Sequence, residues 1–177
     1  NLQQVPRTSR QLFGGLYGHQ IIAVDYSQLE VRIAAAIAND IKMLQALESD
    51  DVHSAVGSQI YMKLQSEVSK EERRNAKAAT FTLLFGGTAN ALYAHARQQG
   101  DSLSRSEANH IVEAFFSTYD GLQRARTRAY AMAQNHRVVT VRLPLGAKRV
   151  LVGRKLSPAT ILNTTVQGTA AIGLKVA

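Results

Sequence analysis

The sequence predicts an α+β fold that is mostly helical, with a small antiparallel sheet and a long helical insertion. Only three prolines occur, at positions 6, 144 and 158, so most of the chain is free to form helices. Two Ser-x-x-Glu sequences mark helix starts, and residues 138–152 alternate in the manner of a β-hairpin. Helices and a short sheet are therefore expected together in one chain.

The N-terminal part contains a predicted strand followed by predicted helices. Residues 20–25 form a short apolar run that ends on an acid, which indicates a buried strand. Residues 29–39 have helical composition, and Asp40 is a candidate cap for a helix over residues 41–50. A further helix is predicted around residues 53–63. With this strand and the hairpin, both ends of the chain supply the sheet.

The two Ser-x-x-Glu sequences predict the main helices of the insertion, which spans about residues 48–135. Ser69 and Glu72 form a capping box for a helix that starts near Lys70, and the Gly86-Gly87 pair is its natural stop.

The second capping box, Ser104 with Glu107, begins a helix that continues to about Thr118. A basic helix follows over about residues 122–135. The last predicted helix starts at about Pro158, because Pro is favoured in the first turn of a helix.

Composition limits the class of partner. The chain of 177 residues is 45% hydrophobic and 19% charged, which is typical of a globular protein. A net charge of +8 and a pI near 10.0 favour a polyanionic partner, with nucleic acid first and an anionic membrane surface second. The absence of cysteine excludes disulfides and thiolate metal sites. No apolar run is long enough to cross a membrane, and no signal-peptide pattern occurs.

A row of two cations and two aromatic residues runs along the first capped helix. Arg73, Lys77, Phe81 and Phe85 recur at every fourth position of RRNAKAATFTLLFGG (73–87). Four residues advance a helix by about 6 Å, so the first three lie along a stripe of about 12 Å. A nucleoside triphosphate has matching polarity, since phosphates bind Arg and Lys while aromatic rings pack on sugar and base. Solvated surface cations and core aromatics are the alternative.

This segment resembles the fingers motif of the family A DNA polymerases, the bacterial DNA polymerase I type. The motif is Arg, Lys, Phe or Tyr, then Tyr-Gly, with three residues between successive members, and it matches at Arg73, Lys77, Phe81 and Gly86. Phe85 stands at the usual Tyr position, and Thr82 where Gly is common. The resemblance implies that Phe81 selects against dideoxynucleotides.

VDYSQLEVR (24–32) resembles the first palm motif of the same family. The resemblance implies that Asp25 binds catalytic Mg²⁺, with the Tyr26 carbonyl as an additional ligand, in a reaction that uses two Mg²⁺ ions. Gln28 belongs to the substrate-binding part of the motif, and Glu30 would exclude ribonucleotides. In the family pattern, the hydroxyl of the Tyr at the position of Phe85 helps to hold this Glu. Because Phe85 has no hydroxyl, either Glu30 is held differently or discrimination between the sugars is weaker. An unchanged ratio of dNTP to rNTP incorporation in Phe85→Tyr would reject the second version.

Two further segments extend the resemblance. DDVHSAV (50–56) is similar to the family's Asp-Ile-His segment, which implies that His53 contacts the triphosphate. NTTVQGTAA (163–171) is similar to its Asn-x-Pro-x-Gln-Gly-Thr-Ala-Ala helix, which implies that Asn163 and Gln167 contact template and primer. Here Thr165 replaces Pro, Ile172 replaces Asp, and Ala159 replaces an Arg.

Further cations are candidates for contacts with the DNA backbone. Arg149 belongs to the predicted hairpin, with Arg142 and Lys148, and a second set lies on the basic helix. Plain solvated surface is the alternative for both sets. NLQQVPR resembles the family's Asn-Leu-Gln-x-Ile-Pro stretch and makes Arg7 and Arg10 weaker candidates.

The resemblance implies a palm-type sheet with a helical fingers insertion, as in right-hand polymerases. The implied division is palm at 1–47, fingers at 48–135, and palm hairpin with a template-contacting helix at 136–177. The family's third motif, which supplies the second metal-binding Asp, does not occur in the sequence, so the isolated chain is expected to be inactive. The alternatives are a single-subunit RNA polymerase fragment and a non-catalytic basic DNA-binding protein.

The implied partners are primer-template DNA and dNTPs, without a membrane and with no oligomer indicated. The implied location is the cytoplasm of a bacterium or phage-infected host, with an organelle as the alternative.

Overall fold

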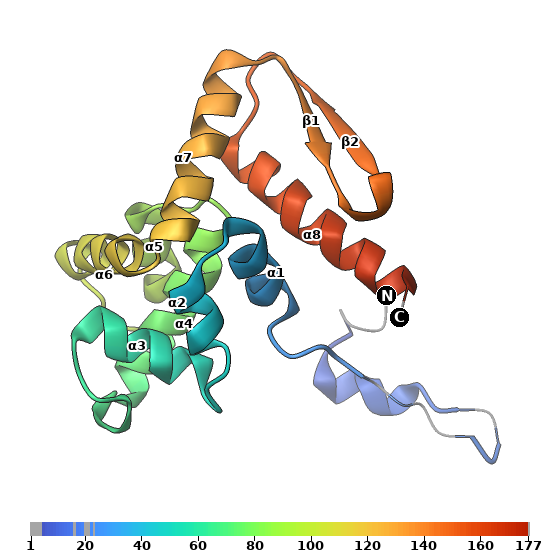
Figure 1. Ribbon diagram of the computed structural model, residues 1–177. Helices are drawn as coiled ribbons and strands as arrows, with labels where there is room; N and C mark the ends of the chain where they lie inside the picture. The colour runs from blue at the N-terminus through green and yellow to red at the C-terminus, as the bar shows by residue number, and fades with distance from the viewer. Residues whose placement is uncertain (1–4, 16, 20–21, 23, 177) are drawn as a thin grey trace.

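A computed structural model describes residues 5–15, 17–19, 22 and 24–176, and it confirms a mostly helical α+β fold (Figure 1). Eight α-helices, two strands and three short 3-10 helices are present in these residues: η2 Arg7–Leu12, α1 Leu29–Ala38, α2 Ile41–Ala46, α3 Val52–Tyr61, η3 Gln65–Glu67, α4 Lys70–Leu84, α5 Ala89–Gln99, α6 Arg105–Thr118, α7 Asp120–Asn135, β1 Val138–Arg142, η4 Pro144–Gly146, β2 Lys148–Val152 and α8 Pro158–Val176.

Both predicted capping boxes are formed. At the start of α4, Ser69 Oγ accepts from Glu72 N at 3.2 Å, and Glu72 Oε2 accepts from Ser69 N at 2.9 Å. Ser104 and Glu107 make the same pair of bonds at α6. Each box satisfies two backbone N–H groups that a helix start leaves unpaired, so both helices begin where the sequence predicts.

The end of α4 is fixed by Gly86. Its φ of +78° lies in the left-handed region, and a Cβ there would lie 3.0 Å from Ala159 Cα at the start of α8. Only glycine combines this backbone conformation with such a close approach at low cost. The end of the candidate fingers helix is therefore held against the C-terminal helix.

Helix α5 has no predicted counterpart. Thr88 Oγ1 accepts from Ala91 N at 3.5 Å at its start, and Gly100 ends it with a φ of +78°. Leu92 and Ala96 are its buried residues, so this polar helix packs through a narrow stripe. Cap signals at both ends were present in the sequence, but the weak apolar periodicity between them hid the helix.

The sheet differs from the prediction at the N-terminal end. β1 and β2 form the predicted hairpin, with Val139 opposite Leu151 and Val141 opposite Arg149. The predicted strand at residues 20–25 is wrong for the residues that the structure describes there. Ile22 and Val24 are 83% and 86% exposed, and within the described chain the two hairpin strands pair only with each other. A strand needs a hydrogen-bonding neighbour, and none of the described strands lies beside it.

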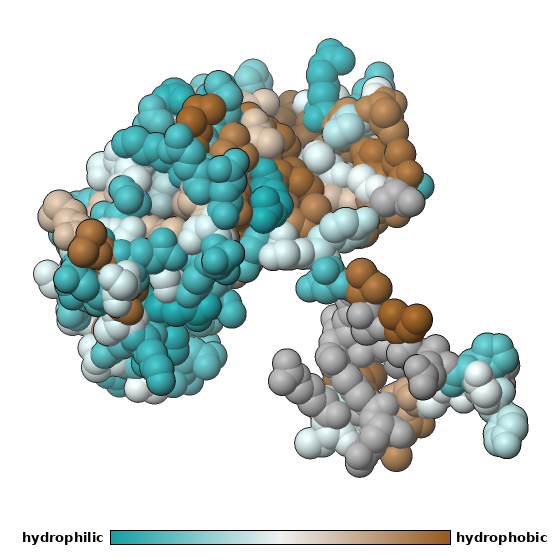
Figure 2. Space-filling view, turned by 60° about the horizontal axis from the view of Figure 1, so that its bottom comes forward, coloured by the Kyte–Doolittle hydropathy of each residue, from teal (hydrophilic) through white to brown (hydrophobic). Residues whose placement is uncertain are grey.

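Two apolar clusters form the core. The larger cluster contains residues of the helices from α1 through α7, together with Val166 of α8. Phe115 and Tyr119 are among its fully buried side chains. The smaller one lies between α7, the hairpin and α8 and contains Ala129, Val139, Val141, Leu156 and Ile161. Figure 1 shows η2 and the other described residues before α1 lying away from this helical body, and Figure 2 shows the same from another side. No described helix is long and apolar enough to cross a membrane.

A buried carboxylate connects the start of α2 to the start of α7. Asp40 is fully buried; its Oδ1 accepts from Met43 N at 2.9 Å, and its Oδ2 accepts from Leu122 N at 3.0 Å. A Cβ on Gly121 would lie 2.8 Å from Asp40 Cβ, so glycine permits this contact. The predicted cap of the second helix is thus confirmed, and it also holds a helix 82 residues away.

Candidate nucleotide-binding site

The predicted row on α4 is present, and its members divide between two sides of the helix. Lys77, Phe81 and Phe85 line an open groove of about 750 Å³, with His95 and Gln99 of α5 on its other wall. Phe81 also faces α3, where its ring centroid lies 6.0 Å from that of His53. Phe85 is the C-cap residue of α4, so the position of the last aromatic ring of the row depends on where the helix ends.

His53 is placed at the centre of this region by α3. It is 4% exposed, and burial lowers the pKa of its imidazole, with the nearby cations Lys77 and Arg73 acting in the same direction. Near neutral pH the ring is therefore neutral. Its Nδ1 has no hydrogen-bond partner in the described residues.

Gln28 connects the carboxylate motif to His53. Its side-chain Nε2 lies 3.4 Å from His53 Nε2 and donates to that nitrogen when it is unprotonated. Gln28 precedes α1 with a φ of +53°, a left-handed conformation that costs a non-glycine residue about 1–2 kcal/mol. Gln28 therefore connects the segment that contains the first palm motif to α3.

Arg73 is held by a carboxylate that the sequence analysis did not select. Asp51 Oδ2 accepts from Arg73 Nε at 2.6 Å, and Asp51 Oδ1 accepts from Arg73 Nη2 at 3.1 Å. This fork-to-fork bond lowers the pKa of Asp51 well below its usual range and raises the pKa of Arg73. Arg73 is therefore fixed in position yet remains partly exposed, with 42% of its side chain open to solvent.

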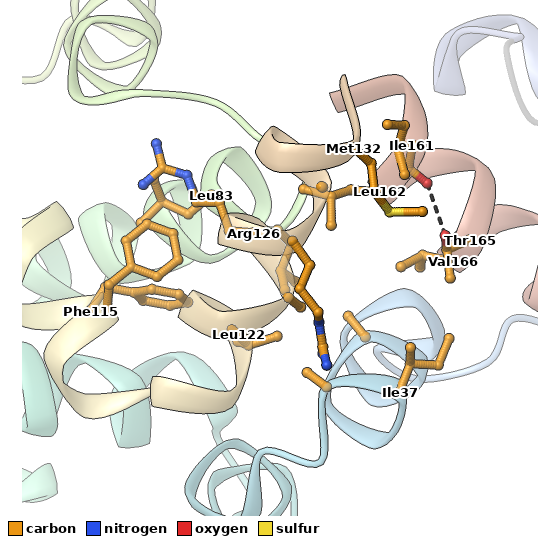
Figure 3. A pocket seen from close by; sticks show the side chains of 17 residues that line it. Ile37, Leu83, Phe115, Leu122, Arg126, Met132, Ile161, Leu162, Thr165 and Val166 are labelled. Atoms are coloured by element: carbon orange, nitrogen blue, oxygen red, sulfur yellow. Dashed lines mark hydrogen bonds between the residues drawn. The ribbon is translucent and has the colours of Figure 1, made fainter. Parts of the chain in front are cut away.

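A second pocket lies away from this row. It has a volume of about 190 Å³ between α1, α4, α6, α7 and α8, and its lining is almost entirely apolar (Figure 3). Arg126 enters this region, with its guanidinium 4.7 Å from the Phe116 ring centroid. None of the predicted site residues lines it. The groove on α4 is therefore the better candidate for a charged ligand.

Comparisons with known proteins identify the family of the chain. The sequence pattern of DNA polymerase family A matches residues 1–177. This chain belongs to the family A DNA polymerases. DNA polymerase I of Pseudomonas aeruginosa is 37% identical over 97% of the chain, which covers 20% of that protein. DNA polymerase I of Aquifex aeolicus is 32% identical over the whole chain, which covers 30% of that protein.

A solved structure extends the similarity to the fold of this family A chain. The "POL domain of Pol1 from M. smegmatis complex with DNA primer-template and dNTP" is 30% identical with a TM-score of 0.70. The match covers 86% of this chain and 27% of that one. The chain thus spans about a fifth to a third of the length of the relatives that it matches.

The remaining residues of the first palm motif of this family A chain lie close to the start of α1. Asp25 and Tyr26 are exposed and belong to neither a helix nor a strand, so Asp25 does not end a strand as predicted. Glu30 is half-buried in the first turn of α1. In the described residues no three His, Asp or Glu side chains form a group that could hold a metal ion. A single exposed carboxylate does not match the ligand set of two Mg²⁺ ions.

The predicted nucleic-acid residues lie on the C-terminal elements. Asn163 and Gln167 are one turn apart on α8; Gln167 is exposed, and Asn163 Oδ1 is buried without a partner in the described residues. Arg149 is exposed on β2. Arg7 and Arg10 fall in η2, but their side chains lie outside the described part of the structure. The structure therefore places the α8 pair and Arg149 on the elements that the sequence predicts.

Thr165, which stands where the family has Pro, keeps α8 continuous. Its Oγ1 donates to Ile161 O at 2.9 Å, as Figure 3 shows. A proline there would remove a helical N–H donor and would clash with the preceding turn. This departure from the family pattern therefore has a local structural consequence, an uninterrupted helix beneath Asn163 and Gln167.

Proposed function

We propose that this chain forms the nucleotide-binding part of a DNA polymerase that adds dNTPs to a primer 3′ end under the direction of a template. The observation that carries the proposal is the cluster of His53, Arg73, Lys77 and Phe81 on two packed helices of a family A chain. The named relatives are DNA polymerases, and the similar solved structure contains primer-template DNA and dNTP.

The cations and the histidine would bind the triphosphate. Arg73 offers a planar set of N–H donors to phosphate oxygens, and Lys77 is an exposed ammonium one turn along the same helix. His53 lies close enough to both cations for their charges to lower its pKa, and a bound triphosphate would oppose that effect. Binding would place negative phosphate charge beside Arg73 and Lys77, which is favourable.

The aromatic residues would hold the sugar and base. Phe81 and Phe85 both line the groove, and flat rings can pack on ribose or stack on any base. Glu30 would exclude ribonucleotides. Phe85 has no hydroxyl and so cannot donate a hydrogen bond to the Glu30 carboxylate. We propose Asp25 as the single carboxylate that this chain contributes to metal binding. On one such ligand, the isolated chain would not extend primers.

The C-terminal elements would hold the duplex. Asn163 and Gln167 can hydrogen-bond to minor-groove acceptors that all base pairs share, which checks geometry without reading sequence. The exposed cations of the hairpin and α7 would bind backbone phosphates. The two remaining alternatives lose support, because the family match favours a DNA polymerase over an RNA polymerase, and a plain DNA-binding protein does not require the α4 row.

Asp25→Ala in a full-length polymerase that carries this segment tests the proposal. Primer extension should be lost while binding of primer-template DNA is retained, because Asp25 is exposed and its replacement should not disturb the core. Glu48→Ala, which removes an exposed acid outside the site, is the matched control and should extend primers normally. Normal extension by Asp25→Ala would contradict the proposal.

A further inference from the structure

We propose that Asp51 is a positioning residue for the triphosphate site, which fixes Arg73 and His53 relative to each other so that one phosphate tail can bind both. The inference rests on the proposed function, because it requires that a triphosphate binds along α4. It assigns a role to a residue that touches neither the sugar nor the base.

The Asp51 carboxylate is itself rigidly held by the first turn of α3. Its Oδ1 accepts from His53 N at 3.2 Å and Ser54 N at 3.4 Å, and its Oδ2 accepts from Ser54 Oγ at 2.7 Å. These bonds make Asp51 the N-cap of the helix that carries His53. Because the same two oxygens also hold Arg73, one side chain sets the position of both candidate phosphate-binding groups.

The bond to Asp51 leaves part of the Arg73 guanidinium available. A guanidinium carries five N–H donors, and Asp51 occupies donors on Nε and Nη2. Nη1 makes no hydrogen bond within the described residues, and the side chain is 42% exposed. Arg73 can therefore keep its bond to Asp51 and still donate to a phosphate oxygen.

Two physical effects predict opposite results when the Asp51 charge is removed. A carboxylate beside an anion site repels the ligand, so a mere neighbour would bind triphosphate more tightly once neutralised. A positioning residue instead holds Arg73 in the orientation that binds, so its loss releases a flexible side chain and weakens binding. The sign of the change in affinity distinguishes the two roles.

Asp51→Asn in the 177-residue chain tests this sign, because asparagine is as good an N-cap as aspartate but carries no charge. Calorimetric titration with dATP in EDTA should show a dissociation constant raised by about five- to tenfold, while the affinity for dAMP is unchanged. Asp50→Asn is the matched control, since it removes the adjacent exposed charge. It should leave dATP affinity unchanged or slightly higher, with the same helix content by circular dichroism.

The outcomes separate this inference from the function on which it rests. Unchanged or tighter dATP binding by Asp51→Asn would overturn the positioning role, and so would an equal loss for dATP and dAMP. In an Arg73→Lys background, Asp51→Asn should cause no further loss; a full additional loss would show that Asp51 does not act through Arg73. Absence of dATP binding by the unmodified chain would instead remove the triphosphate site itself.

Discussion

The α3–α4 region and the C-terminal region from α7 to α8 carry their positive charges in opposite ways. In the former, Arg73 is bonded to Asp51, Lys63 to Glu72, and Arg74 to Asp101. In the latter, residues 121–177 contain ten Lys or Arg side chains and no Asp or Glu. Among the described residues of this stretch, Arg124 forms an ion pair. Its partner is Asp120, the residue directly before the stretch.

Under the proposed function, this difference fits two kinds of anionic ligand. Residues 1–120 contain eleven Lys or Arg and thirteen Asp or Glu, so the positive net charge of the chain comes entirely from the C-terminal region. Cations held by carboxylates keep a fixed geometry, which suits a compact ligand such as a triphosphate. Unpaired cations spread over a hairpin and two helices suit the repeated phosphates of a nucleic-acid backbone.

The largest expected effect separates these two ligands. Replacing Arg142, Lys148 and Arg149 of the hairpin by Gln should weaken binding of a primer-template duplex by on the order of a hundredfold at about 0.1 M salt, since each lost phosphate contact lowers the salt slope by about 0.9. Affinity for dATP should not change. Fluorescence anisotropy over a series of salt concentrations measures both the affinity and the slope.

A matched triple variant controls for the loss of net charge alone. Lys42, Lys70 and Arg97 are exposed cations of the first 120 residues, and their replacement by Gln removes the same charge. Their loss should leave the salt slope nearly unchanged. Equal effects of the two triple variants would show that the duplex senses only total charge, and the comparison between the regions would fail.

A smaller effect tests whether the two regions are mechanically joined. Asp40→Asn should lower the free energy of unfolding by about 1–3 kcal/mol, because an amide cannot accept from both Met43 N and Leu122 N and leaves a buried N–H unpaired. Urea unfolding followed by circular dichroism measures this loss. Asp120→Asn, at an exposed position of α7, should have a much smaller effect, since its ion pair with Arg124 is open to solvent.

The Asp40→Asn transition should also be less cooperative than that of the unmodified chain, because Asp40 connects α2 to α7. Stability and cooperativity equal to those of the unmodified chain would contradict the role of Asp40 as the connection.

The elements that the sequence predicted are those whose signals are local. Capping boxes join residues three apart, and a hairpin pairs neighbouring segments, so α4, α6, β1 and β2 were all predicted correctly. The strand predicted at residues 20–25 is not formed by residues 22, 24 and 25, which the structure describes, because a strand depends on a partner that its own residues do not specify. Helix α5 was missed because the residues between its two caps show only a weak apolar periodicity.

The same limit applies to the candidate site. The row from Arg73 to Phe85 could be predicted, because helical periodicity places residues four apart on one face. The bond between Asp51 and Arg73 joins residues 22 apart, and the contact between Gln28 and His53 joins residues 25 apart. These contacts depend on how α1, α3 and α4 pack. Asp51 precedes His53 by two residues in the sequence. Its position as a candidate helix N-cap was the signal that could have selected it.

The smallest expected effect concerns pH and the α3–α4 region. In the free protein burial lowers the pKa of His53, and Lys77 and Arg73 lower it further, so the ring is neutral at pH 7. A bound triphosphate offsets these cations and raises that pKa, so binding takes up a proton as the pH falls below the bound-state pKa. Affinity for dATP should therefore rise by about two- to fivefold from pH 8 to pH 6.

His53→Gln is the control for this pH dependence, because the triphosphate itself also titrates in this range. The difference between the two pH profiles gives the contribution of His53 alone. Binding of the duplex should show no such difference, since the hairpin cations lie on a different element from His53. Identical dATP profiles for the two proteins would mean that the phosphates do not reach His53, and the proposed site would then reduce to Arg73 and Lys77.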